Sequence, residues 1–209
     1  RRVLFRSRRI YSRFPVENHK INYDPVAKFS GGAEQRKIWG PLLVQKVNEI
    51  MKEHTGQRGI IHTHNFAIAD LLMQTCSPEV RSRFLYQRNF DNNKNALLDQ
   101  HNYSTDSVIV APAMHEGLDL ADDLSRFQIV CKVPYPNFFD DKQLAARKDV
   151  DPQFYNWITA LKLVQSVGRS VRSETDWATT YILDESFAWF FHSNKAMLPP
   201  WFTNCLIGI

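Results

Sequence analysis

The sequence lacks several motifs that would define an activity on their own. It has no G-x-x-x-x-G-K-[ST] phosphate loop, and no Asp-Glu pair closes an apolar run in the manner of a Walker B carboxylate. It also lacks the G-x-S-x-G elbow that presents a nucleophilic serine. This absence argues against a hydrolase nucleophile at Ser166, Ser170 or Ser173.

Long apolar runs are absent as well. No stretch approaches about 18 apolar residues and no signal peptide is visible, so we expect no transmembrane helix and a cytoplasmic location. Repeats and low-complexity tracts are missing too. Hydrophobic residues make up 44% and charged residues 23% of the 209 residues, as in one ordinary globular domain. The net charge of +4 permits an anionic partner without establishing one.

Cysteine is scarce. Cys76, Cys131 and Cys205 are far apart and odd in number, and no CxxC or Cys/His spacing indicates zinc or an iron–sulfur cluster. We therefore expect three reduced, buried thiols.

The amino terminus begins with Arg rather than Met and reads Arg1-Arg-Val-Leu-Phe-Arg-Ser7. A common sequencing-adapter oligonucleotide encodes this heptapeptide in one frame, so we interpret residues 1–7 as an adapter-derived artefact. Residues 8–209 would then be the carboxy-terminal part of a longer protein. The alternative is a native basic amphipathic start, and resequencing upstream distinguishes the two.

Apolar runs alternate with helical periodicity along the chain. The predicted strands are Gly59–Asn65, Arg83–Gln87, Ser107–Pro112, Phe127–Val133 and Trp177–Leu183. The predicted helices are Ala33–His54 (kinked or split at Pro41), Phe66–Thr75, Asp91–Asn102, Asp140–Asp151 and Pro152–Val171. Residues 8–30 are predicted to form an extended segment. This alternation predicts a three-layer α/β domain with a mainly parallel sheet.

Ligands of such sheets bind beyond the carboxyl ends of the strands. We expect three polar clusters at that edge: Thr63–Asn65, Ala113–Asp119 and the loop into Gln165. In the second cluster, Glu116 and Asp119 lie on either side of Gly117. Such a carboxylate pair can hold water, a ribose hydroxyl or an arginine, although a solvated loop is the alternative.

The most informative stretch is Gln165-Ser-Val-Gly168-Arg169-Ser-Val-Arg172, which follows an apolar helical run. Two guanidiniums three residues apart can converge on one anionic group if the segment turns helically. Gly168 lets the backbone approach a ligand or another chain, and Gln165 adds an amide that both donates and accepts. This set suits the γ-phosphate of a nucleotide, where arginines offset developing charge. A solvated basic helix face is the alternative.

Two further groups favour structural roles. His62, His64 and His115 could indicate a metal site, but the first two only share one face of a strand, so we expect no metal ion. The aromatic residues near the carboxy terminus could stack on bases, but core packing is favoured. They are Trp177, Trp189, Trp201, Phe187, Phe190 and Phe191.

Taken in order, these segments resemble the second motor domain of superfamily 2 DNA helicases of the DinG/XPD-like group, of bacterial or phage type. Gln165-x-x-Gly168-Arg169-x-x-Arg172 resembles motif VI, and Glu116-Gly117-Leu118-Asp119 resembles motif V. The segments similar to motif IV and to the stretches flanking the motifs are Gly59–Asn65, Ser12–Asn18, Lys132–Pro136 and Tyr181–Asp184. Met114 and His115 depart from the family's aromatic pair, which puts DNA contacts there in doubt.

The resemblance implies a RecA-like domain 2 of a P-loop NTPase helicase, with ATP held between two motor domains. The residues it implies at the γ-phosphate, as catalytic groups, are Arg169, Arg172 and Gln165. Those implied in ATP binding and coupling are Gly168, Glu116, Gly117 and Asp119. Those implied along single-stranded DNA are Thr63, His64, Asn65, Pro112 and Ala113.

The Mg²⁺ ligands are expected on the missing amino-terminal motor domain, so this fragment alone should not hydrolyse ATP. The implied partners are single-stranded DNA and that first motor domain, with no membrane. Two alternatives stay open: a non-catalytic nucleic-acid-binding module with a RecA-like fold, or the helicase part of an exonuclease–helicase fusion. The upstream sequence distinguishes them.

Overall fold

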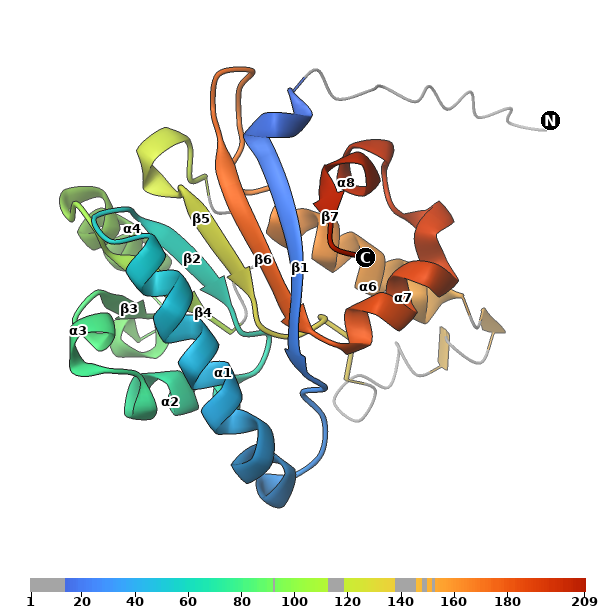
Figure 1. Cartoon of the computed structure of the whole chain (residues 1–209), viewed down its shortest axis with the longest axis horizontal. Coiled ribbons are helices and arrows are strands. Elements are labelled where there is room, and N and C mark those ends of the chain that lie inside the picture. The colour runs from blue at the N-terminus through green and yellow to red at the C-terminus, as the bar shows by residue number, and fades with distance from the viewer. Residues whose placement is uncertain (1–13, 92, 113–118, 138–145, 148–149, 152) are drawn as a thin grey trace.

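A computed structural model describes residues 14–91, 93–112, 119–137, 146–147, 150–151 and 153–209. Seven strands form one parallel sheet in the order β3-β4-β2-β5-β6-β1-β7 (Figure 1). The strands are β1 His19–Ala27, β2 Gly59–His62, β3 Phe84–Tyr86, β4 Val108–Ala111, β5 Phe127–Val130, β6 Ala178–Asp184 and β7 Leu206–Ile207. The helices are α1 Ala33–Glu53, α2 Phe66–Thr75, α3 Pro78–Arg81, α4 Lys94–Tyr103, α6 Phe154–Val167, α7 Ser186–Asn194 and α8 Pro200–Cys205. The predicted α/β fold with a mainly parallel sheet is confirmed.

Helices cover both faces of the sheet, because successive strand residues point to opposite faces and the inner strands are apolar on both. Ile61 of β2 packs in one core with α1, α2 and α3. Its neighbour Ile60 packs on the opposite face with Leu97 of α4. A third core joins α6, α7 and α8 to β1, β5 and β6 on that opposite face. The result is the predicted three-layer arrangement.

Most predicted elements coincide with those observed, but three differ. The helix around Pro41 is neither interrupted nor split, since α1 runs from Ala33 to Glu53. The helix predicted over Pro152–Val171 ends at Val167. The extended segment predicted for residues 8–30 contributes an inner strand, β1, which pairs with β6 and β7. The helix predicted over Asp140–Asp151 lies largely outside the described residues.

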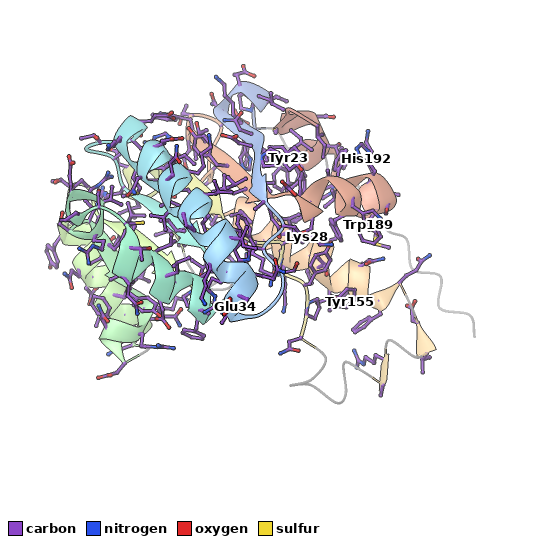
Figure 2. The ribbon with its side chains drawn as sticks, turned by 60° about the horizontal axis from the view of Figure 1, so that its bottom comes forward. Tyr23, Lys28, Glu34, Tyr155, Trp189 and His192 are labelled. Carbon is purple, nitrogen blue, oxygen red and sulfur yellow. The ribbon has the colours of Figure 1, made fainter. Side chains whose placement is uncertain are left out.

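Five of the six carboxy-terminal aromatic residues divide into two groups, and the sixth, Trp201, is half-buried against the third core. Phe187 and Phe190 are fully buried and Phe191 is nearly so, which confirms core packing for these three. Trp189 is 63% exposed at the surface of α7 (Figure 2), and Trp177 is 42% exposed before β6. The two exposed indoles are therefore not part of the core.

The three cysteines are free and buried, as predicted. Burial raises the pKa of the Cys76 thiol to about 12, so this group stays protonated at neutral pH. Among the described residues, no helix is long and apolar enough to cross a membrane.

Candidate functional site

The motif-bearing end of α6 lies at the amino edge of the sheet, where the parallel strands begin. The carbonyl of Val167 accepts a hydrogen bond from Gln128 Nε2 at 2.7 Å and lies 3.2 Å from His19 Nε2. Gln128 and His19 stand at the amino ends of β5 and β1. The prediction that the loop into Gln165 lies at the carboxyl edge is therefore wrong, because α6 runs back along the sheet against the strand direction.

Gly168 follows the last helical residue and makes a close approach to its own chain. Its N–H donates to the carbonyl of Val164 at 2.9 Å. A Cβ at this position would lie 3.0 Å from that same oxygen and 3.9 Å from the ring of Trp201. Gln165 is half-buried within α6. The glycine here thus avoids a tight contact with the Val164 carbonyl at the end of α6.

Both arginines of the motif lie in the segment of residues 168–177, which we call the arginine loop. The helix has ended at Val167, so the helical turn expected to bring Arg169 and Arg172 together is not present. Arg169 is half-buried and Arg172 is exposed. Arg172 Nε lies 3.1 Å from Asp119 Oδ1, so the structure brings together residues from the motif VI-like and motif V-like segments.

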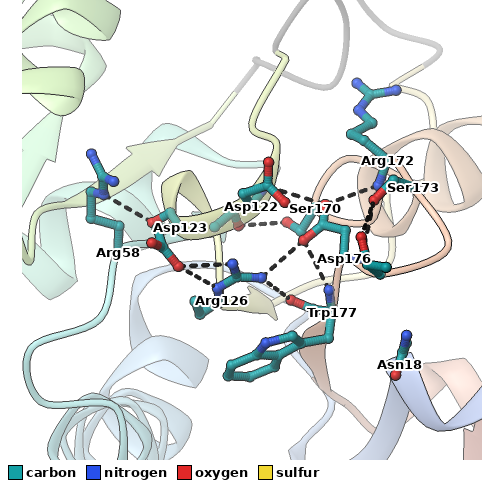
Figure 3. A network of polar contacts seen from close by, with 12 residues as sticks. Asn18, Arg58, Asp122, Asp123, Arg126, Ser170, Arg172, Ser173, Asp176 and Trp177 are labelled. Carbon is teal, nitrogen blue, oxygen red and sulfur yellow. Dashed lines mark hydrogen bonds and ion pairs between the residues drawn. The ribbon is translucent and has the colours of Figure 1, made fainter.

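A buried carboxylate, Asp176, ties the arginine loop to the start of β5 (Figure 3). It accepts hydrogen bonds from the backbone N–H groups of Arg172 and Asp122. It also forms an ion pair with Arg126 at 2.9 Å, and the Arg126 guanidinium lies 4.8 Å from the ring of Trp177. Asp176 and Arg126 were not among the site residues predicted from the sequence. The available signal was an acid placed between the arginine motif and the next strand.

A second polar cluster lies at the opposite, carboxyl edge of the sheet. Thr63 directly follows β2 and its N–H donates to the carbonyl of Ala111, the last residue of β4. The side chains of Thr63 and Pro112 are buried here. His64 has a positive φ of 51°, and the exposed Asn65 caps α2 by accepting a hydrogen bond from the Ala67 N–H at 2.7 Å.

Some predicted site residues fall outside the described residues: Ala113, Glu116 and Gly117. Pro112 follows β4 at the carboxyl edge, whereas Asp119 contacts the arginine loop at the amino edge. The prediction that Asp119 lies at the carboxyl edge is therefore wrong.

Comparison with known proteins gives a consistent assignment. Residues 47–205 match the sequence profile described as the helicase C-terminal domain. The ATP-dependent DNA helicase CHL1 of Debaryomyces hansenii is 28% identical over 96 residues, which cover 38% of this chain and 12% of that protein. The ATP-dependent DNA helicase chl-1 of Caenorhabditis elegans is 29% identical over 101 residues, covering 45% and 12%. The chain thus spans about an eighth of these relatives' length.

Solved structures support the fold. A structure titled XPD_APO matches with a TM-score of 0.63 at 15% identity over 85% of this chain and 38% of its own. Another, Xpd4 of S. tokodaii, matches with a TM-score of 0.58 at 13% identity, covering 91% and 38%. The curated relatives named above are eukaryotic, so the predicted bacterial or phage type stays a prediction.

Proposed function

Because this chain belongs to the helicase C-terminal domain family, we propose that it is the second motor domain of an ATP-dependent DNA helicase acting in the cytoplasm. The observation that carries the proposal is the meeting of Arg172 and Asp119 at the amino edge, at 3.1 Å. An arginine on a loop can exchange a carboxylate partner for a phosphate group that another domain brings to it.

The exposure of this ion pair explains how such an exchange can occur. The side chains of Arg172 and Asp119 are 36% and 84% exposed. Exposed pairs contribute only about 0–1 kcal/mol, so releasing Arg172 from Asp119 costs little. A γ-phosphate carries more negative charge than one carboxylate and accepts charge-assisted hydrogen bonds from a guanidinium. In this scheme Arg172, with Arg169, offsets the charge that develops during phosphoryl transfer, and Gln165 senses the phosphate.

The first motor domain would hold the ATP phosphates and Mg²⁺, and this chain would supply the arginines. On this basis the chain alone does not hydrolyse ATP. Closure of the two domains around ATP, followed by opening, would then drive movement along DNA.

We place the single-stranded DNA along the carboxyl edge, beside His64 and Asn65. Asn65 and the amino end of α2 offer polar groups to a phosphate, and the amino terminus of a helix favours anions. Thr63 and Pro112 are buried and would hold in place the segment that contacts the DNA. Glu116, Gly117 and Asp119 would couple the two edges.

The test is steady-state ATPase activity of the full-length protein with saturating single-stranded DNA. Arg172→Ala and Arg169→Ala should each lower kcat by about 10³- to 10⁵-fold, because removal of an arginine finger has costs of this size. Arg147→Ala is the matched control, since Arg147 is an exposed arginine near the opposite end of α6. Near-normal turnover in either loop variant would refute the finger assignment.

A further inference from the structure

Asp176 is the most completely hydrogen-bonded acid in the part of the chain that the structure describes. It is 1% exposed, and both of its carboxylate oxygens are used. Oδ2 accepts from the N–H of Arg172 at 3.0 Å and from the N–H of Asp122 at 3.2 Å. Oδ1 accepts from its neighbour's N–H, that of Trp177, at 2.8 Å and from Arg126 at 2.9 Å.

One oxygen of Asp176 therefore joins two segments that are far apart in sequence. One is the arginine loop, through the backbone of Arg172, and the other is the segment that begins at Asp119, through the backbone of Asp122. These are also the segments whose side chains meet in the Arg172–Asp119 pair. The Asp176 carboxylate thus holds together the backbones of the two segments whose side chains form the exposed Arg172–Asp119 ion pair.

We propose that Asp176 is a positioning residue for Arg172: it holds the backbone of the arginine loop against the Asp122 segment, so that the guanidinium is preset for the γ-phosphate. This inference rests on the proposed function. Asp176 itself touches no nucleotide in this scheme and acts only through Arg172. A misplacement of about 1 Å can lower a rate about 10²-fold, so fixing this loop has a direct kinetic consequence.

The position requires a carboxylate rather than an amide. Four donors converge on two oxygens, and an asparagine offers only one oxygen beside an NH₂ group that is itself a donor. Whichever way the amide is turned, its NH₂ faces either the N–H groups of Arg172 and Asp122 or Arg126. Arg126 compensates the buried charge of Asp176, since its own side chain is only 12% exposed.

The chain offers a closely matched control in Asp123. Its carboxylate also pairs with Arg126, at 2.8 Å, but its side chain is 80% exposed. Asp123→Asn removes an ion pair with the same arginine, and no described contact links the Asp123 side chain to Arg172. A difference between the Asp123 and Asp176 variants therefore reports the tie to the arginine loop rather than the loss of a charge beside Arg126.

The experiment measures DNA-stimulated ATPase activity of the full-length protein carrying Asp176→Asn, Asp123→Asn, Arg172→Ala or the double change Asp176→Asn with Arg172→Ala. We expect Asp176→Asn to lower kcat about 10- to 100-fold with the KM for ATP changed less than about threefold. Asp123→Asn should change kcat less than about threefold. In the Arg172→Ala background, measured by single-turnover hydrolysis, Asp176→Asn should lower the rate by less than about twofold more. The effects are not additive because Asp176 acts only through Arg172.

A merely structural role gives a different pattern, because loss of folded protein lowers activity by the same factor in both backgrounds. Equal losses in the two backgrounds, or a near-normal kcat for Asp176→Asn, would overturn the positioning role and leave the proposed function standing. Near-normal turnover of Arg172→Ala would overturn both. The non-additive pattern supports the positioning role.

Discussion

Substituting Asp119 by asparagine tests which group the Asp119 carboxylate contacts. The resemblance to helicases leaves two possibilities: Asp119 contacts a ribose hydroxyl of ATP, or it contacts the facing arginine. The structure has Arg172 Nε at 3.1 Å from Asp119 Oδ1. If the arginine is the partner, Asp119 competes with the γ-phosphate for Arg172, and Asp119→Asn should strengthen ATP binding. If the ribose is the partner, the same change should weaken it.

The size of the effect follows from the exposure of the pair. The two side chains are 36% and 84% exposed, so solvent screens their attraction and the pair is worth about 0.2–1 kcal/mol. Releasing Arg172 should therefore lower the KM for ATP by about 1.4- to 5-fold and no more. The change should shrink as salt rises, because the Debye length falls to about 3 Å at 1 M.

The assay is ATPase activity of the full-length protein over a range of ATP concentrations, at low and high NaCl, with Asp123→Asn as the control for a nearby exposed acid. A KM for Asp119→Asn that rises, at either salt concentration, contradicts the competition argument and favours the ribose. A lowered KM that is insensitive to salt also contradicts it, because salt screens the attraction between two exposed charges.

Two further predictions concern stability. Arg83→Met should lower the free energy of unfolding, measured by urea titration, by about 3 kcal/mol or more. The reason is that the Arg83 side chain is 10% exposed and donates to four backbone carbonyls. The control Arg88→Met, at an exposed site, should lower the free energy of unfolding much less. Burial lowers the pKa of His19, His54 and His101 below 6.5. As pH falls, these histidines therefore bind protons in the unfolded chain at a higher pH than in the folded chain. The urea concentration at the midpoint of unfolding should fall as pH drops below about 6.5, and a midpoint that rises would contradict this.

The inner strands and the helices beside them could be predicted from the sequence because their signals are local. Each four-residue strand, such as Gly59–His62, is buried along its whole length, and its apolar residues, Ile60 and Ile61 in this strand, supply the local signal. Helix α2 was predicted with the observed bounds, Phe66–Thr75, with Pro78 as the signal that ends it. The structure adds that the Asn65 side chain caps its amino end.

Strand β1 could not be assigned to the sheet from local signals. Its sequence carries polar residues and Pro25, and its pairing with β6 shifts register between Tyr23 and Ala27. Its partners are distant in sequence, and β7 has only two residues. Only the assembled sheet reveals that β1 lies between β6 and β7.

The arginines of the candidate site could be found from their spacing, but the groups that hold them could not. Asp176 follows Ser173, whose hydroxyl accepts a hydrogen bond from the Asp176 N–H, so the local sequence has the form of an ordinary turn. Its importance lies in contacts with Asp122 and Arg126, which are about 50 residues away in sequence. Because these contacts come from separate segments of the chain, no fixed spacing in the sequence identifies Asp176.

The direction of α6 also constrains how the two edges of this domain can communicate. Tyr155 at its beginning stacks on Tyr135, which follows β5 at the carboxyl edge, whereas Val167 at its end is bonded at the amino edge. The helix has 14 residues and is therefore about 21 Å long. Its inner face, including Leu163, is fully buried against the sheet, and a packed core of this kind transmits displacement rather than absorbing it. We therefore expect a pull on Arg172 to move the whole domain as one body. Under the proposed function, His64 and Asn65 would then move with it, and stepping along DNA would arise from motion between the two motor domains rather than from rearrangement within this one.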